Sequence, residues 1–257
     1  MRGEICVGSA SFLAFTSLLL MIFVHVSQIN TSAVPRGISL VKINVSDYGA
    51  AVHVAIFDPV DHLYTNDSSA PLEFGAGLRQ FYLFGLYSHC GYVNTSAGTC
   101  TNKTVQNEFQ PYAALTSDML QNYTDLTNFL LGGTAFEDST DSLGGSSRAA
   151  YWMLLLGTIC AALALLTGVA KNNFTFFIST ALAIVGAILL LIGASIWTAM
   201  IHKAQSINSV MIGPPASPVL AGIVVSVGPG LFMIWAAFVA LFASVVPYMV
   251  SCCTYRG

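Results

Sequence analysis

Residues 174–201 read FTFFISTALAIVGAILLLIGASIWTAMI and contain no Asp, Glu, Lys or Arg. A helix needs roughly 20 apolar residues to cross about 30 Å of hydrocarbon, so this stretch is long enough to span a membrane. Three further uncharged runs occupy residues 5–29, 149–170 and 219–250. Together the four runs predict a membrane α-helical protein with an antiparallel bundle of four transmembrane helices.

The overall composition also indicates a membrane protein. Of the 257 residues, 55% are hydrophobic and only 8% are charged, which is too few charges for the surface of a soluble domain of this length. The run at residues 5–29 follows Arg2 and therefore also resembles a secretory signal peptide. It is longer than the apolar core of such a peptide, and no small-x-small cleavage site follows it closely, so we expect a retained span.

The segment between the first two runs, residues 30–148, predicts which side of the membrane faces out. It contains six N-x-Ser/Thr acceptors, a density that favours N-glycosylation and hence a lumenal, then extracellular, position. The acceptors are Asn30, Asn44, Asn66, Asn94, Asn102 and Asn122. In this orientation Arg2, Lys171 and Arg256 lie on the cytoplasmic side, as the positive-inside tendency requires, although the pair at residues 202–203 does not.

The same orientation assigns the remaining segments of a multi-pass plasma-membrane protein. Residues 171–173 form a cytoplasmic turn, so the seventh acceptor there, Asn173, is expected to stay unmodified. Residues 202–218 form a short extracellular loop, and residues 251–257 a cytoplasmic tail. Residues 30–148 carry eleven Asp and Glu against five Lys and Arg. An acidic domain repels phosphate, so no nucleic-acid partner is expected.

Local patterns predict an extracellular domain of strands and a helix. Residues 38–45, 51–56 and 79–87 are rich in β-branched or aromatic residues and predict strands. Residues 58–77 have the Pro, Asp, Asn, Ser and Gly of a loop. Apolar residues recur at helical steps from residue 115 to residue 130, with Thr116 or Ser117 as a cap and Gly132 and Gly133 as the end. Residues 137–147 are acidic and rich in Gly and Ser, which predicts a flexible tether.

The membrane runs contain few residues that suggest transport. His25 is the sole ionisable residue within them, which argues against a proton-coupled transporter or an ion pore. Small residues four apart in spans two and three allow close helix approach; they are Ala164 with Gly168, and Ala183 with Ala187. Gly228-Pro229-Gly230 in the fourth run predicts a kink or a break in that helix.

No pattern in the sequence predicts catalysis, a metal or a cofactor. Asp58, Asp61 and His62 suggest a metal site, but solvated loop polars explain them better because no second ligand cluster accompanies them. There is no Gly-rich phosphate loop and no His-Glu-x-x-His. Ser88-His89-Cys90 resembles a nucleophile beside a base, yet adjacent side chains on a strand point to opposite faces. We therefore expect a protein that is not an enzyme.

The six cysteines fall into three groups. Cys90 and Cys100 lie in the extracellular segment, where two thiols in an oxidising compartment are expected to pair and close a hairpin. Cys6 and Cys160 lie within the membrane runs and are interpreted as small apolar residues. A third group, Cys252 and Cys253, follows the fourth run and is a candidate for palmitoylation.

The run Gly85-Leu-Tyr-Ser-His-Cys90, followed by Cys100, resembles the Gly-Leu-Trp-x-x-Cys…Cys signature of the claudin superfamily. Tyr87 stands where that signature has Trp. The long, sequon-rich first loop resembles most the fungal SUR/PalI family of four-span eisosome and cell-cortex proteins. A fungal claudin-like mating family that influences calcium entry is a second possibility.

The resemblance implies a claudin-like fold, with a small extracellular sheet of four or five strands beside the helix bundle. It implies structural roles in the core of that sheet for Gly85, Leu86, Tyr87, Cys90 and Cys100. It also implies a non-catalytic organiser or scaffold that associates laterally with membrane lipids, with itself or other integral membrane proteins, and with the cell wall. The alternative is an auxiliary subunit of a larger channel or membrane-bound synthase. A small transporter or receptor is a third interpretation, but no polar cavity among the spans is indicated.

Overall fold

The computed structural model describes residues 2–138, 140–169 and 173–254, and the chain divides into two compact units. The helical unit comprises Met1–His25, Ala149–Trp197 and Gly230–Gly257. The sheet unit comprises Val26–Arg148 and Thr198–Pro229.

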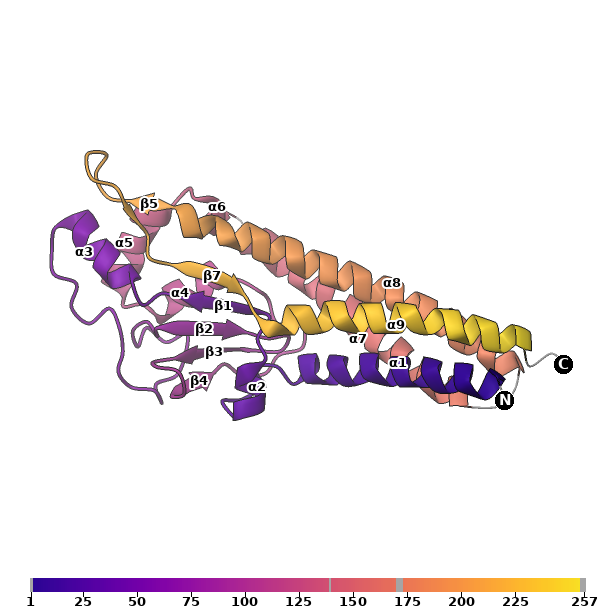
Figure 1. Ribbon diagram of the computed structural model, residues 1–257. Coiled ribbons are helices and arrows are strands. Elements are labelled where there is room, and N and C mark those ends of the chain that lie inside the picture. The colour runs from indigo at the N-terminus through magenta and orange to yellow at the C-terminus, as the bar shows by residue number, and fades with distance from the viewer. Residues whose placement is uncertain (1, 139, 170–172, 255–257) are drawn as a thin grey trace. The chain divides into compact units, whose positions relative to one another are not determined.

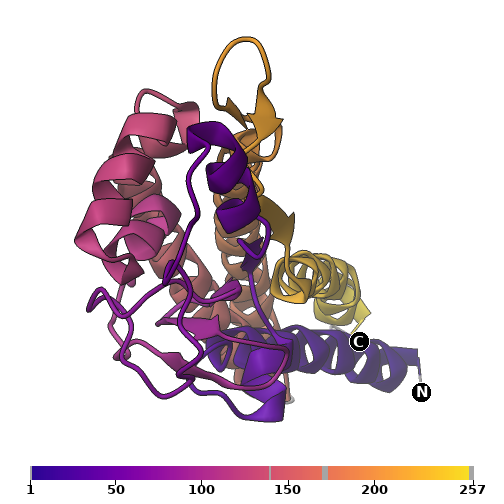
Figure 2. The same cartoon turned by 90° about the vertical axis from the view of Figure 1, so that its left-hand side faces the viewer.

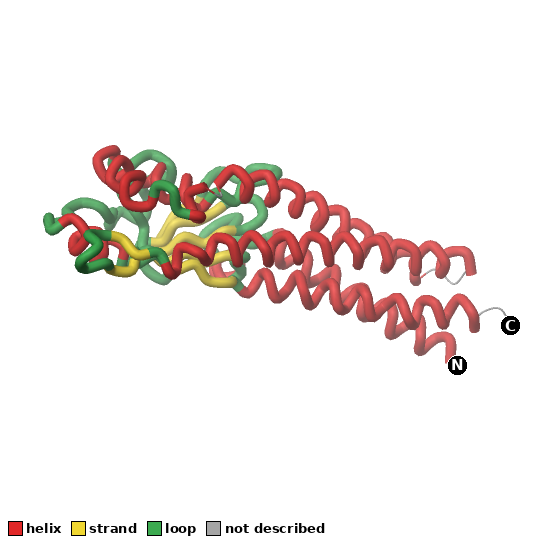
Figure 3. The backbone as a smooth tube through the Cα atoms, turned by 90° about the horizontal axis from the view of Figure 1, so that it is seen from above, coloured by secondary structure: helices red, strands yellow, loops and turns green. Residues whose placement is uncertain are grey.

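Four long helices supply the helical unit: α1 (Arg2–His25), α7 (Thr140–Val169), α8 (Asn173–Ala204) and α9 (Pro229–Thr254). Their segments within the unit lie side by side in Figures 1 and 3. In the described chain, four helices are long and apolar enough to cross a membrane. The predicted four-span bundle is therefore confirmed, and the chain is a multi-pass membrane protein.

Small residues bring the helices of this unit together, as predicted for spans two and three. A Cβ added to Gly168 would lie 2.6 Å from the ring of Tyr248, and one added to Gly157 would lie 2.8 Å from Leu190. Ala164, Ala183 and Ala187 are buried. Large apolar side chains instead point outward; Phe12, Leu166, Phe177 and Phe242 are each more than 60% exposed. Such surfaces suit hydrocarbon as the solvent.

The sheet unit is built on an antiparallel sheet, which has five strands within the described residues (Figure 1). The strand order is β4-β3-β2-β1-β7. The strands are β1 (Val41–Asn44), β2 (Phe81–Phe84), β3 (His89–Tyr92), β4 (Gly98–Cys100) and β7 (Val224–Val227). The strands predicted within residues 38–45 and 79–87 are therefore confirmed, and so is the claudin-like sheet.

The predicted fourth span from residue 219 begins too early. Residues 219–227 form the short strand β6 (Val219–Leu220) and then β7, which pairs with β1 along Val41–Asn44. A run of β-branched valines explains the strand, whose neighbouring residues Val224 and Val225 are exposed and buried respectively. Of the predicted kink or break at Gly228-Pro229-Gly230, the structure shows the break: β7 ends at Val227 and Pro229 opens α9, where a missing N–H costs no helical bond.

A side chain covers the free edge of β7. Asn208 lies in the 3-10 helix η1 (Gln205–Ser209), and its amide oxygen accepts a hydrogen bond from the backbone N–H of Val225 at 2.7 Å. Its amide nitrogen donates to the carbonyl of Val225 at 3.0 Å. Asn208 thus satisfies edge groups that would otherwise be open to another strand. The predicted loop 202–218 is accordingly part of the sheet unit, and within it β5 (Met211–Ile212) pairs with β6.

Residues 51–56, predicted as a strand, belong to helix α3 (Tyr48–Ile56). Tyr48, Ala51 and Val52 are buried at steps of three and four, which is a helical face. Phe57 adopts a left-handed conformation and donates its N–H to the carbonyl of His53, which ends the helix. A short apolar run does not by itself distinguish strand from helix, and here the helical face was the stronger pattern.

The predicted helix of residues 115–130 is two helices, α4 (Pro111–Asp118) and α5 (Gln121–Leu131). Its predicted end at Gly132 is confirmed, but Pro111 starts the first helix in place of the predicted cap. The short helices α2 (Ala33–Gly37) and α6 (Ala135–Asp138) complete the unit. Figure 2 shows the pink helices of residues 111–138 gathered on one side of the sheet unit.

The predicted flexible tether at residues 137–147 is mostly helical, because α6 ends at Asp138 and α7 begins at Thr140. Phe136 and Leu143 are buried, and the hydroxyl of Ser147 accepts a hydrogen bond from the N–H of Phe109 at 2.9 Å. Tertiary contacts therefore order a segment whose composition alone favours a linker.

The predicted disulfide is present, with Cys90 of β3 joined to Cys100 of β4. The two residues are direct partners in the antiparallel register, so the bond ties the edge strand β4 to the sheet. Cys6 and Cys160 are free cysteines.

Replacing Cys100 with Ser should lower the free energy of unfolding of the sheet unit by about 2 to 3 kcal/mol, because the bond closes a ten-residue separation. Thermal unfolding of the detergent-purified protein and delivery of the chain to the cell surface are the measurements. Cys160→Ser, which removes a thiol outside any disulfide, is the matched control and should change little. Equal loss in both variants would contradict a stabilising role for this bond.

Candidate functional site

The family-motif residues fix the turn between β2 and β3. Gly85 follows β2, and a Cβ there would lie 2.5 Å from the carbonyl oxygen of Ser27. Leu86 is buried and Tyr87 is half-buried. The hydroxyl of Ser88 donates to the carbonyl of Gln28 at 2.6 Å. These contacts hold the turn against residues 27–28, and they are structural.

Gln28, a residue that sequence reasoning missed, organises the start of the sheet unit. Its backbone is left-handed, with φ of 52°, and its side chain is fully buried. Its amide nitrogen donates to the carbonyls of Pro35 at 2.9 Å and Ile38 at 3.0 Å. One side chain thereby ties α2 to the chain that leads into β1.

Ser88-His89-Cys90, which the sequence analysis rejected as a nucleophile beside a base, has structural partners at two of its three residues. The Ser88 hydroxyl is hydrogen-bonded to Gln28, and the Cys90 sulfur is in the disulfide. Asp58, Asp61 and His62 lie exposed on the loop after α3. Among the described residues, no group of three His, Cys, Asp or Glu side chains is arranged to hold a metal.

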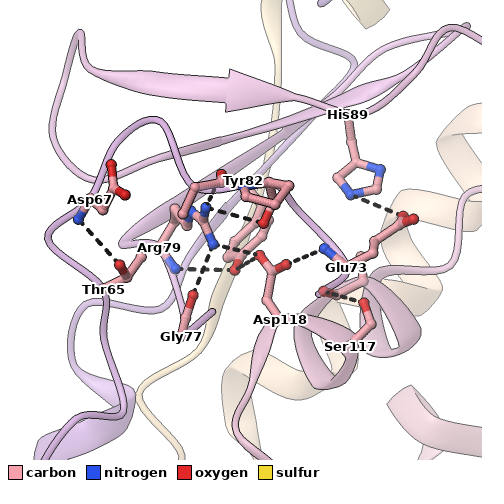
Figure 4. Close-up of polar contacts among 12 residues, drawn as sticks. Thr65, Asp67, Glu73, Gly77, Arg79, Tyr82, His89, Ser117 and Asp118 are labelled. Carbon is pink, nitrogen blue, oxygen red and sulfur yellow. Dashed lines mark hydrogen bonds and ion pairs between the residues drawn. The ribbon is translucent and has the colours of Figure 1, made fainter. Parts of the chain in front are cut away.

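A buried charge cluster, consisting of Arg79, Tyr82 and Asp118, lies beside the sheet (Figure 4). The side chains of Arg79 and Asp118 are both fully buried, with Nη1 and Oδ2 3.5 Å apart. The Tyr82 hydroxyl donates to Asp118 Oδ2 at 2.6 Å, and the backbone N–H of Glu73 donates to Oδ1 at 2.5 Å. Burial raises the pKa of Asp118, and the hydrogen bonds and the guanidinium oppose that shift.

Arg79 also fixes the loop that precedes it. Its Nη1 donates to the carbonyl of Gly77 at 3.0 Å, and its Nη2 donates to the carbonyl of Ala70. The N–H groups of Gly75 and Gly77 bond to the last carbonyls of α4, those of Ser117 and Asp118. The cluster and these bonds explain why the helix ends at Asp118.

A pocket of about 560 Å³ lies next to this cluster, within the sheet unit. It is lined by residues of two strands, β2 and β3, and of two helices, α4 and the first part of α7. The loop before β2 and the segment before α4 contribute the remaining lining residues. The polar groups that matter here are Glu73, His89, Gln106, Glu108, Gln110 and Arg148. Arg148 and Glu108 form an ion pair, and the Glu108 carboxylate also accepts from the amide of Gln110 at 2.8 Å.

His89 is the most unusual group of the pocket. Its ring stacks on Phe84 with centroids 5.0 Å apart, and its side chain is 6% exposed. Nε2 points toward Glu73, 3.7 Å from Oε1, which is too long for a hydrogen bond (Figure 4). Burial lowers the pKa of His89 to about 4. Burial and the charge of Asp118 raise the pKa of Glu73. His89 is therefore neutral at pH 7.

Sequence reasoning missed Glu73, Arg79 and Asp118, although two of them carried a signal. Arg79 begins an otherwise apolar predicted strand, and Asp118 falls within a predicted amphipathic helix. A charged residue in each of two packed segments indicates an ion pair between them.

The predicted glycosylation acceptors differ in exposure. Asn44 lies in β1, half-buried, and its side-chain oxygen accepts from the N–H of Ser46 at 3.0 Å. The exposed acceptors are Asn30, Asn66, Asn94, Asn102 and Asn122. The side chains of Cys252 and Cys253, the palmitoylation candidates, lie outside the described residues.

Comparison with known proteins gives one finding about the whole chain. The model of the SUR7/PalI family matches residues 6–247, which include α7, α8, most of α1 and α9, and the whole sheet unit. A comparison with curated proteins found no match.

Asp118→Asn should lower the free energy of unfolding by about 3 to 5 kcal/mol, because it leaves the buried Arg79 guanidinium without its counter-charge. Asp61→Asn, at an exposed position of the loop after α3, is the control and should stay within about 0.5 kcal/mol of wild type. Thermal unfolding of both variants in the same detergent is the measurement. A small effect of Asp118→Asn would show that the pair is dispensable.

His89 should make stability depend on pH. Since its pKa is lowered from 6.5 to about 4, the unfolded chain binds the proton first, and stability falls as pH drops from about 6.5 to about 4. At pH 5 the loss is about 2 kcal/mol relative to pH 8. His89→Gln should remove that part of the dependence, whereas His53→Gln, at an exposed position, should retain it. Unfolding curves across this range that match for His89→Gln and wild type would contradict the assignment.

Proposed function

The chain belongs to the SUR7/PalI family, and from this membership we propose that it is a non-catalytic organiser of the plasma membrane. In this role it associates laterally with itself or with other integral membrane proteins at the cell cortex, and its sheet unit faces the cell wall. Family membership is the observation that carries the proposal. It supports a membrane-associated role directly, and the remaining steps are inferences from the chain.

The helical unit offers wide apolar surfaces for such association. Bulky side chains on all four long helices point outward, among them Phe12, Leu166, Phe177 and Phe242. In a bilayer these faces contact lipid or the helices of other proteins, and association there depends on packing and not on the hydrophobic effect.

The sheet unit supports an extracellular position through its acceptors. Five of the six predicted glycosylation sites are exposed, and disulfides persist in oxidising compartments. Ser88 and Cys90 have structural partners, which favours binding over catalysis for this unit.

Gentle detergent extraction followed by native size determination and mass spectrometry tests the proposal. We expect a self-assembly, or a set of membrane partners, with glycans on residues 30–148. A monomer that captures no partner would refute the organiser role. A fixed complex with one large channel or synthase would instead establish the auxiliary subunit.

The orientation has its own control within the same experiment. Asn66→Gln, Asn102→Gln and Asn122→Gln should each remove one glycan and shift the mass accordingly. Asn173→Gln, in the predicted cytoplasmic turn, should leave the mass of the glycans unchanged. Glycan loss from Asn173→Gln alone would reverse the assigned sides.

A further inference from the structure

One face of the sheet is open in part, across the neighbouring strands β1, β2 and β3 (Figure 1). In the antiparallel register, Lys42 of β1 lies opposite Leu83 of β2. Phe81, two residues before Leu83, lies opposite Tyr92 of β3. These four side chains share one face, because residues two apart on a strand point the same way. Lys42 is exposed, and Phe81 and Leu83 are half-buried, so the face is accessible.

This face forms a pocket of about 320 Å³, here called the basic pocket, whose lining residues all belong to the sheet unit. Besides the three strands, Arg36 of α2 and Pro229 at the start of α9 contribute to its lining. The lining contains two cationic side chains, those of Arg36 and Lys42, and no Asp or Glu.

No carboxylate of the described residues balances either cation, because the ion pairs there involve other basic side chains. The Lys42 ammonium lies 4.9 Å from the centre of the Phe81 ring, a contact that leaves its charge in place. The Arg36 guanidinium donates from Nη1 to the carbonyl of Ser96 at 3.2 Å and has further N–H groups to donate. The basic pocket is therefore positive within a segment where acids outnumber bases.

We propose that the basic pocket binds the phosphate of an anionic lipid headgroup. A guanidinium matches phosphate oxygens with parallel N–H bonds, and an ammonium adds a point charge. A bilayer supplies such a group here, because Pro229 is both a lining residue and the first residue of the membrane span Pro229–Met249. Headgroups lie at the ends of membrane spans.

The charges favour a lipid over a soluble phosphate and an anionic headgroup over a zwitterionic one. The net charge of −3 repels free anions from a distance, whereas acyl chains hold a headgroup at the membrane surface against that field. A phosphocholine headgroup carries its own cation, which Arg36 and Lys42 repel. Phe81 and Leu83 add an apolar wall, which suits the carbon atoms of a lipid better than a free phosphate.

This inference requires the membrane spans, and it uses neither the organiser role nor the assigned outer side. A chain that captures no partner protein but still selects the anionic headgroup would refute the organiser role and leave the basic pocket in place.

The test is native mass spectrometry of the full-length protein in a neutral detergent, mixed with equal amounts of phosphatidylglycerol and phosphatidylcholine of the same acyl chains. We expect at least about a tenfold excess of phosphatidylglycerol among the bound lipids, the factor that one charge-assisted bond supplies. Equal retention of the two lipids would overturn the proposal. Displacement of the bound lipid by about 10 mM glycerol 3-phosphate would instead identify a site for soluble phosphate and refute the lipid.

The glycans need a control of their own, because the predicted acceptor Asn94 belongs to the lining. The measurement is therefore made before and after enzymatic removal of the glycans. Selectivity that appears only after their removal would show that the native chain does not use the pocket, and the proposal would fail.

Four substitutions place the binding at the basic pocket. Lys42→Gln, at an exposed strand position, and Arg36→Gln should each lower the preference for phosphatidylglycerol about tenfold, whereas Lys42→Arg should retain it. Lys103→Gln removes an exposed base of the same unit outside the lining and should leave the preference unchanged. An undiminished preference in Lys42→Gln and Arg36→Gln, with wild-type melting temperatures, would place the lipid elsewhere and refute the site.

Discussion

The buried ion pair between Arg79 and Asp118 is the interaction on which the sheet unit depends. Removing two charges from water costs several kcal/mol for each ion, and the attraction between them offsets that cost only when their other polar groups are also satisfied. Tyr82 and the backbone N–H of Glu73 complete the carboxylate, and carbonyls of the preceding loop accept from Nη1 and Nη2 of the guanidinium, while its buried Nε has no partner among the described residues. The pair therefore specifies where β2, the loop before it and the end of α4 must meet.

The pocket is a consequence of that arrangement. The bond from Glu73 to Asp118 fixes the backbone of Glu73 in a left-handed conformation, with φ of 67°. This conformation is uncommon for a residue with a side chain, and the surrounding bonds are what hold it. With the backbone fixed, the half-exposed carboxylate of Glu73 points toward His89. The same cluster thus stabilises the fold and positions one wall of the candidate site.

The sequence predicts features that depend on composition along one segment. An uncharged run long enough to cross a bilayer as a helix predicts a membrane span at any place in the chain. Two cysteines on either side of a turn predict a disulfide that closes a hairpin. The predicted start of the fourth span was wrong because residues 219–227 are as apolar as a membrane span. Only the pairing of residues 224–227 with β1 makes them a strand. The prediction for residues 137–147 was wrong for the same reason, since Ser147 is held by Phe109. The prediction for residues 51–56 was wrong because a short apolar run does not distinguish a strand from a helix. The pocket was not predictable, because His89 and Glu73 approach only through the folded loop.

The two units differ in the kind of side chain that they present at their surfaces. In the helical unit, the space beside glycines such as Gly157, Gly168 and Gly186 is already occupied by side chains of neighbouring helices. Small-residue stripes that often drive helix association are therefore used within the bundle, and its outward faces carry large, chemically similar apolar groups. Surfaces of this kind distinguish partners poorly, because lipid tails match them equally well. For the proposed organiser, discrimination between partners would then come from polar groups with fixed geometry, and in the described chain these lie mainly in the sheet unit, where burial, charge and an ordered loop hold them in place.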